Sequence, residues 1–150
     1  MKRFVLLLFT ISCLIISPSH SNAITTPCSL VLNPIDTELK NAQGVALIYK
    51  VQLNPQSFER TNISILGVHL PEPSSYGNYD SYEGFAFKPE VISWRFKLYP
   101  SPELDSPTWA GRFDDITAEL ENAEVQIRLS NTKSGELGPP ILENSVKNCK

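Results

Sequence analysis

The segment 71–84, PEPSSYGNYDSYEG, holds the residue types in this chain that are best suited to binding chemistry. Tyrosine rings give rigid amphipathic contacts that can stack on sugars or anchor a protein contact, and the small polar residues between them give adaptable hydrogen bonds. Fourteen residues is also a long connection for a compact domain. The alternative is a plain surface loop whose tyrosines fold back on the domain. The predicted contact residues are Tyr76, Asn78, Tyr79, Asp80 and Tyr82.

A crowd of carboxylates forms the second candidate group. Its members are Asp114, Asp115, Glu119, Glu121 and Glu124. Glycosidases need two carboxylates roughly 5–10 Å apart across a cleft. Alternation instead places Glu119 and Glu121 on the solvent side of a strand, which favours a solvated face that protects a sheet edge. Asp114 and Asp115 could supply oxygens to Ca²⁺, but the chain has no D-x-D-x-D-G loop, so no metal site is predicted.

The first 23 residues predict export. A basic start precedes an apolar run over 4–16, and the small residues Ser21 and Ala23 occupy the −3 and −1 positions of a cleavage site. An apolar run of about 13 residues is too short to span a bilayer, which takes about 20. The sequence therefore predicts a signal peptide over 1–23 and one mature domain over 24–150, secreted or periplasmic, with no membrane span.

The placement of the cysteines agrees with export. Cys13 lies in the signal and leaves with it, and because the apolar run continues past it, a lipid-modified Cys13 is the disfavoured alternative. Cys28 and Cys149 remain, near the two ends of the mature domain. Two such thiols usually pair in an oxidising compartment, so we predict a Cys28–Cys149 disulfide.

Catalysis and cofactor binding have few groups available in the mature chain. His69 is its single histidine, and it lies on an apolar stretch without a triad motif around it. One histidine and two paired cysteines do not make a transition-metal site. The sequence therefore predicts no catalytic residues, no cofactor and no enzyme activity.

Alternating apolar residues predict strands along most of the mature chain. The clearest strand covers 91–99, where Ile92, Trp94, Phe96 and Leu98 are expected to face inward. Further strands are expected over 28–32, 45–53, 62–70, 83–88, 109–113, 115–120 and 124–130, with 115–120 and 124–130 paired as a hairpin. Helix signals are limited to one or two turns within 35–43.

Short strands with prolines between them predict an antiparallel β-sandwich of about seven to eight strands, with Trp94 at its centre. This layout is similar to that of immunoglobulin and fibronectin type III domains. It lacks the buried cysteine pair of antibody domains, because Cys28 and Cys149 are both terminal.

Charge and length limit the class of partner. The chain has 13 basic and 16 acidic residues, and removal of Lys2 and Arg3 leaves 11 basic residues, a net charge of −5. Nucleic acid is a poor partner for such a chain, because affinity there comes from phosphate neutralisation. The remaining 127 residues are enough for one domain with its own core.

Three hypotheses for function follow. The first is an exported, soluble, monomeric binding module that recognises a protein or a glycan through the tyrosine-rich segment. The second is a structural component of an extracellular or envelope assembly, for which association should depend on concentration. The third, a carboxylate-dependent hydrolase, needs two convergent carboxylates with perturbed pKa values in a cleft.

Overall fold

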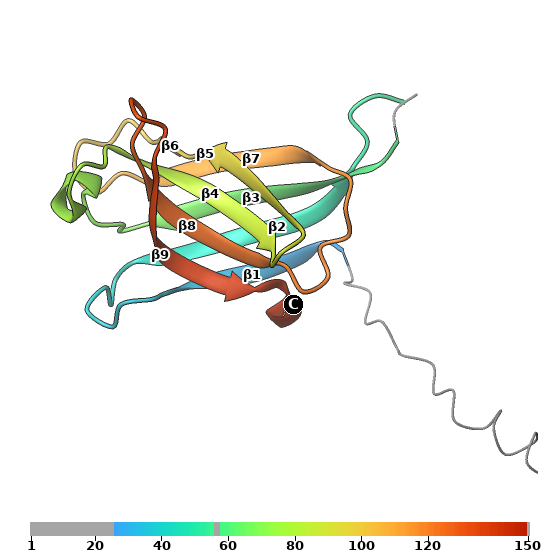
Figure 1. Ribbon diagram of the computed structural model, residues 1–150, viewed down its shortest axis with the longest axis horizontal. Coiled ribbons are helices and arrows are strands. Elements are labelled where there is room, and N and C mark those ends of the chain that lie inside the picture. Colours follow the sequence, from blue (N-terminus) through green and yellow to red (C-terminus); the bar gives the residue numbers. More distant parts are fainter. Residues whose placement is uncertain (1–25, 56–57, 150) are drawn as a thin grey trace, which may run out of the picture.

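The structure is a computed structural model that describes residues 26–55 and 58–149, and these residues form an all-β domain (Figure 1). The strands are β1 (Cys28–Pro34), β2 (Gln43–Val51), β3 (Arg60–Val68), β4 (Ser81–Lys88), β5 (Ile92–Lys97), β6 (Tyr99–Pro100), β7 (Trp109–Ile116), β8 (Glu124–Ser130) and β9 (Leu137–Ser145). Two short 3-10 helices, η1 (Pro73–Tyr76) and η2 (Val146–Asn148), complete the described elements. The predicted signal peptide lies outside the described residues.

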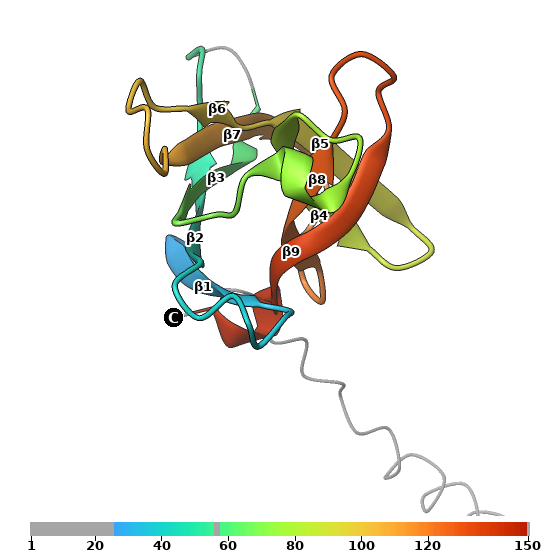
Figure 2. The same cartoon turned by 90° about the vertical axis from the view of Figure 1, so that its left-hand side faces the viewer.

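All nine strands belong to one antiparallel sheet, in the order β5-β4-β8-β9-β1-β2-β3-β7-β6. The sheet curls until its two ends nearly meet, so the molecule resembles a nearly closed barrel (Figure 2). The all-β, antiparallel prediction is confirmed, whereas the two-sheet sandwich of seven to eight strands is wrong. Alternation reports which side chains face the interior, and a sandwich and a barrel share that pattern.

Two stretches of chain change strand partner, and the second of them brings the ends of the sheet together. In β1, the first five residues pair with β2, whereas Asn33 and Pro34 pair with β9. β5 pairs with β4, and after Leu98 the chain continues as β6, which pairs with β7 at the other end of the sheet. Gly111 of β7 lies against the Lys97 carbonyl, where any Cβ would clash. The missing side chain at Gly111 therefore allows the close approach.

The interior is filled by the inward set of each strand. Trp94, Phe96 and Leu98 are buried as predicted. Ile92 is exposed instead, because it is the first residue of β5 and follows directly on the turn at 89–91. β2 has apolar residues on both faces, and it turns Val45 outward while Ala46 faces the core.

The predicted hairpin of 115–120 and 124–130 does not form. β7 pairs with β3 and β6, whereas β8 pairs with β4 and β9, so the connection 117–123 joins two distant parts of the sheet. β9 was not expected, because it contains Pro139 and Pro140 and proline removes a ladder donor. The segment between β1 and β2 makes hydrogen-bonded turns rather than a helix.

The predicted Cys28–Cys149 disulfide is present, with the two Cα atoms 5.5 Å apart across a sequence separation of 121. It fastens the start of β1 to the segment after η2, so the two described ends of the chain lie together at one end of the barrel (Figure 1). Within the described residues, none of the helices has the length and apolar character to cross a membrane.

Candidate functional site

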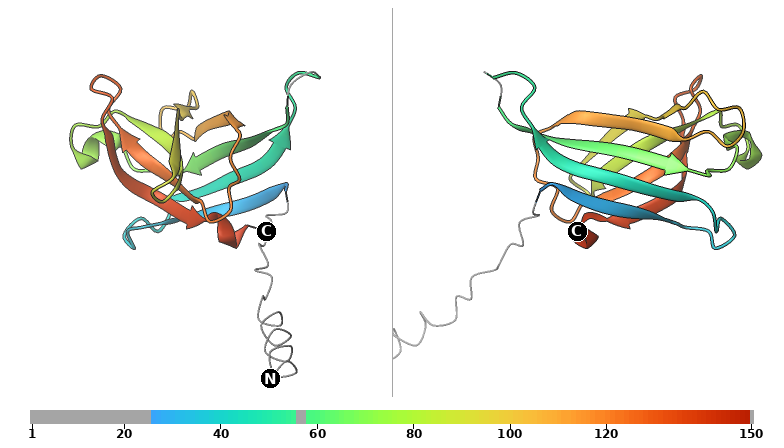
Figure 3. Two further views of the ribbon diagram at one scale, coloured as in Figure 1. Left: turned by 45° about the vertical axis from the view of Figure 1, so that its right-hand side comes forward. Right: turned by 180° about the vertical axis from the view of Figure 1, so that it is seen from behind.

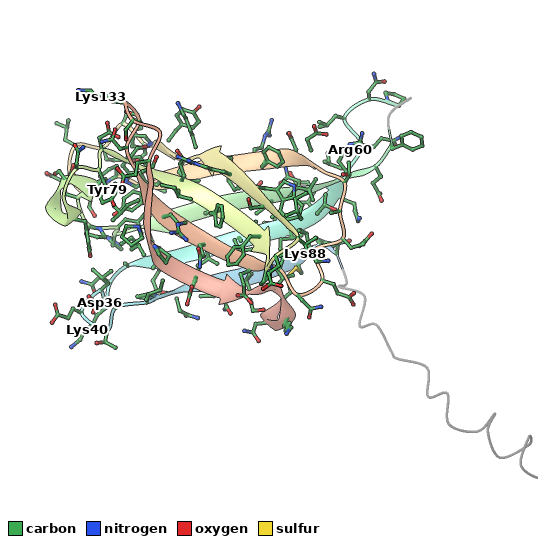
Figure 4. All side chains as sticks on the ribbon, in the orientation of Figure 1. Asp36, Lys40, Arg60, Tyr79, Lys88 and Lys133 are labelled. Atoms are coloured by element: carbon green, nitrogen blue, oxygen red, sulfur yellow. A yellow bond between two sulfur atoms is a disulfide. The ribbon has the colours of Figure 1, made fainter. Side chains whose placement is uncertain are left out.

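Four connections gather at the end of the barrel opposite the disulfide, and we call this end the loop end. The connections are 35–42, 69–80, 101–108 and 131–136 (Figure 2). Figure 4 labels Asp36, Lys40, Tyr79 and Lys133 there, and Arg60 and Lys88 at the opposite end. Antiparallel strands bring alternate connections to the same end, so segments far apart in sequence become one surface. The tyrosine-rich segment lies mostly on this surface.

Tyr82 is not part of that surface. It is the second residue of β4 and is fully buried, with its ring in an edge-to-face contact with Trp109 at 5.2 Å between centroids. Its hydroxyl donates a hydrogen bond to the Pro71 carbonyl oxygen at 2.7 Å. Burial raises the pKa of the Tyr82 hydroxyl above its usual value. Tyr82 is therefore a core residue, and its predicted role as a binding contact is wrong.

The connections 69–80 and 131–136 are joined by a set of hydrogen bonds. The Asp80 carboxylate accepts from the Thr132 backbone N–H at 2.8 Å and from the Thr132 hydroxyl at 2.7 Å. The Asn131 side-chain amide donates to the Asn78 carbonyl oxygen at 2.7 Å. The bonds from Thr132 lower the pKa of Asp80, so the carboxylate is ionised at neutral pH. Two loops that are distant in sequence therefore form one ordered unit.

Tyr79 and Tyr76 have different positions on this unit. Tyr79 is half-buried and lies against Gly138 of β9, where an added Cβ would come within 2.5 Å of the ring. Tyr76 ends η1 and is 39% exposed. Of the five predicted contact residues, the structure brings four together on the loop end, and among the three tyrosines Tyr76 presents the most surface.

Leu104 is a candidate contact that sequence reasoning missed. It is 98% exposed in the connection 101–108, between Glu103 and Asp105. The base of this connection is closed by two bonds: Ser101 N–H to the Thr108 carbonyl at 2.7 Å, and Thr108 N–H to the Ser101 hydroxyl at 2.9 Å. An isolated leucine within a proline-rich stretch is the sequence signal that could have identified it.

The loop end carries the net charge of residues 24–150. Its ionisable residues are Asp36, Glu38, Glu72, Asp80, Glu103, Asp105 and Glu136, with Lys40 and Lys133. Seven acidic and two basic residues give −5, and the rest of 24–150 holds nine acidic and nine basic residues. The rest of residues 24–150 is therefore neutral overall, and the loop end is acidic.

Two of the grouped carboxylates outside the loop end, Asp114 and Asp115, are paired with cations. Asp115 accepts from Arg60 Nε at 3.1 Å, and Asp114 lies 3.5 Å from Arg112 Nε. Within the described residues, no group of three or more His, Cys, Asp or Glu side chains is placed to hold a metal ion.

Glu83 of β4 is a buried carboxylate that the sequence did not single out. Burial alone would raise its pKa, but hydrogen bonds from Arg95 and from the Ser130 hydroxyl, the latter at 2.7 Å, lower it below the usual value. Arg95 also donates to the Gly135 carbonyl at 3.0 Å, which ties this pair to the connection 131–136. The geometry of Glu83 is that of a structural ion pair.

Comparison with known proteins gives a family and no solved structure. Residues 24–150 match the family described as "SPbeta prophage-derived uncharacterized protein YoqH". A protein of Bacillus subtilis (strain 168) with the same description is 62% identical over 149 residues, which is 99% of each chain. No solved structure matches the chain. On the strength of these two matches, the chain belongs to the YoqH family.

Proposed function

We propose that this protein is an exported binding module that recognises another protein through its loop end. The observation that carries the proposal is the bonded junction of Asp80 and Asn78 with Thr132 and Asn131, which holds two loops in one arrangement. A surface that is ordered before binding loses less conformational entropy when a partner docks. The proposal includes cleavage of the signal peptide after Ala23 and assigns the chain no catalytic step.

The exposed side chains on this end favour a protein over a glycan as the partner. Tyr76 and Leu104 offer an aromatic and an aliphatic anchor, and such anchors fill pockets at the centre of protein interfaces. The acidic character of the loop end favours a partner with a basic surface, because opposite potentials steer association and select against like-charged partners. A basic protein outside the cytoplasm is therefore the expected ligand.

Affinity capture with the mature chain, 24–150, tests this proposal. The variant with both Tyr76→Ser and Leu104→Ser should lose the captured partner while it keeps the wild-type circular dichroism spectrum and melting temperature. Val91→Ser is the matched control, because Val91 is also apolar and exposed but lies on the turn at the opposite end. Undiminished capture by the folded double variant would reject the loop end. If the chain binds a glycan array and captures no protein, the partner is a glycan and not a protein.

A structural role in an assembly is the second candidate. It is favoured by a specific observation, the exposure of apolar side chains on one outer face of the sheet. This candidate needs no loop contact, and it predicts self-association or stacking through the sheet.

A further inference from the structure

One outer face of the barrel presents a row of apolar side chains to solvent. The row runs directly across five neighbouring strands in the observed register: Val31 of β1, Val45 of β2, Leu66 of β3, Ala110 of β7 and Tyr99 of β6. Its larger members are between 36% and 67% exposed, and Leu47, in the adjacent row, is also exposed. We call these six residues the apolar face. Figure 3 (right) shows β1, β2, β3 and β7 side by side on this outer face.

The outer face of the other strands differs in composition. β4, β5, β8 and β9 carry a polar network there that includes Glu83, Arg95, Arg128 and Glu143. Near the apolar face, the ion pair of Arg112 and Asp114 contributes no net charge. Phe85 and Phe87 of β4 also point outward on that half, but they are partly buried and Arg128 lies over the Phe85 ring, so the more exposed outward apolar side chains of the strands are those of the apolar face. A contiguous exposed apolar patch of this kind marks an interaction site.

We propose that a second copy of this chain covers the apolar face, so that the protein forms a homodimer by packing sheet on sheet. Four of the strands, β1, β2, β3 and β7, have seven to nine residues, and at a spacing of about 4.8 Å and a length of roughly 25 Å they cover on the order of 500 Å² in projection, which the two-residue β6 extends slightly. The accessible area of such a surface is larger than its projection and approaches the ~800 Å² per partner of a standard interface. The area is therefore sufficient for a specific dimer of modest, concentration-dependent stability.

The distribution of charge allows two copies to meet in this way. The apolar face lies on the neutral part of the molecule, and the net negative charge is confined to the loop end. The row lies about three residues from the loop end, so if two copies pack row on row with their loop ends pointing in opposite directions, the acidic ends are separated by roughly 20 Å. That separation exceeds the Debye length of about 8 Å at physiological ionic strength. Charge therefore selects the antiparallel arrangement.

The surface shape also suits a facing sheet. A shallow hollow of about 400 Å³ lies on the apolar face, lined by side chains that include Val45, Leu47, Leu66 and Ala110. Sheets that pack face to face interdigitate their side chains at a spacing of about 10 Å, which would fill such a hollow. The apolar face contains no residue of the loop-end connections, so this inference does not depend on the loop-end proposal, although it rests on the same side chains as the assembly candidate.

Sedimentation velocity of mature protein over a wide range of concentration tests the proposal. We expect the wild-type mass to rise to twice that of the monomer as concentration increases. Leu66→Glu places a charge at the centre of the row and should leave a folded monomer at every concentration. Ser93→Glu is the matched control: it adds the same charge at an exposed outer position of β5, on the polar half, and should leave the dimer intact.

Three other outcomes of these measurements would contradict a homodimer through the apolar face. A wild-type protein that stays monomeric throughout the range overturns the proposal, and so does an equal loss of dimer in both glutamate variants. A monomer whose captured partner is lost on Leu66→Glu would assign the apolar face to a different protein. Tyr76→Ser with Leu104→Ser should leave the dimer unchanged, which separates a failure of this inference from a failure of the loop-end proposal.

Discussion

The Tyr82 hydroxyl donates to the Pro71 carbonyl oxygen at 2.7 Å from within the core. Tyr82→Phe keeps the aromatic ring and its contact with Trp109 but removes this donor. Because an enclosed acceptor that loses its partner costs about 1–3 kcal/mol, the free energy of unfolding in urea should fall by that amount. Tyr76→Phe is the control. Because the Tyr76 hydroxyl belongs to an exposed side chain, its removal should change the free energy of unfolding by less than about 0.5 kcal/mol. Equal losses in the two variants would contradict the core assignment.

Asp80 gives a prediction for pH. Hydrogen bonds from Thr132 lower its pKa below the ordinary 3.8 in the folded protein. Because the folded pKa lies below the unfolded one, the ionised carboxylate stabilises the loop junction above the unfolded pKa, and this stabilisation is lost as pH falls through the folded pKa. The NMR signal of the Thr132 amide should therefore titrate with a midpoint below 3.8. Asp80→Asn should abolish the titration, and a midpoint above 3.8 would refute the assigned contact.

The tyrosines illustrate what residue spacing can predict. Tyr76, Tyr79 and Tyr82 have equal spacing in the sequence, but the segment passes from a 3-10 helix to a loop and then to a strand. Within β4, alternation places Tyr82 with Gly84 and Ala86 on the inward face. The composition of the segment correctly directed attention to a loop. It did not reveal where the strand begins, and that boundary decides which tyrosine is buried.

At the scale of elements, Gly138 in β9 determines how the tyrosine-rich loop lies on the sheet. A Cβ there would meet the Tyr79 ring at 2.5 Å and the Leu129 Cβ at 3.0 Å. Gly138→Ala should therefore displace the loop and lower the free energy of unfolding by about 1–3 kcal/mol, as overpacking does. In a Tyr79→Ser background the same substitution should be less destabilising, since the ring is gone. An undiminished effect there would assign the crowding to Leu129 alone.

Strand existence was easier to predict than strand pairing. The apolar period of β5 placed Trp94, Phe96 and Leu98 inward correctly, because each contact with the core follows from local alternation. The pairing of β7 with β3 depends on contacts across 40 or more residues, which no local pattern contains. β9 was hidden by Pro139 and Pro140, which its ladder with β8 accommodates through shifts of register.

At the scale of the whole molecule, the strand order decides which loops share a surface. Residues from four connections become neighbours only after the sheet has curled, so the acidic loop end could not be seen in the sequence, where its seven carboxylates span 36–136. The same strand order collects outward apolar residues from five strands into the apolar face. Both candidate surfaces are therefore consequences of topology rather than of motifs.

The two surfaces should respond to salt in different ways. Raising the ionic strength from about 0.1 to 1 M shortens the Debye length from about 10 to 3 Å. Capture of a basic partner at the loop end relies on unscreened charge and should weaken as salt rises. The dimer buries apolar surface while the net charge of each copy opposes association, so its dissociation constant should stay constant or fall. Sedimentation and capture on the same preparation, at both salt concentrations, measure the two responses. If partner capture strengthened with salt, the contact with the partner would be apolar. The apolar face, and not the loop end, would then be the expected binding site.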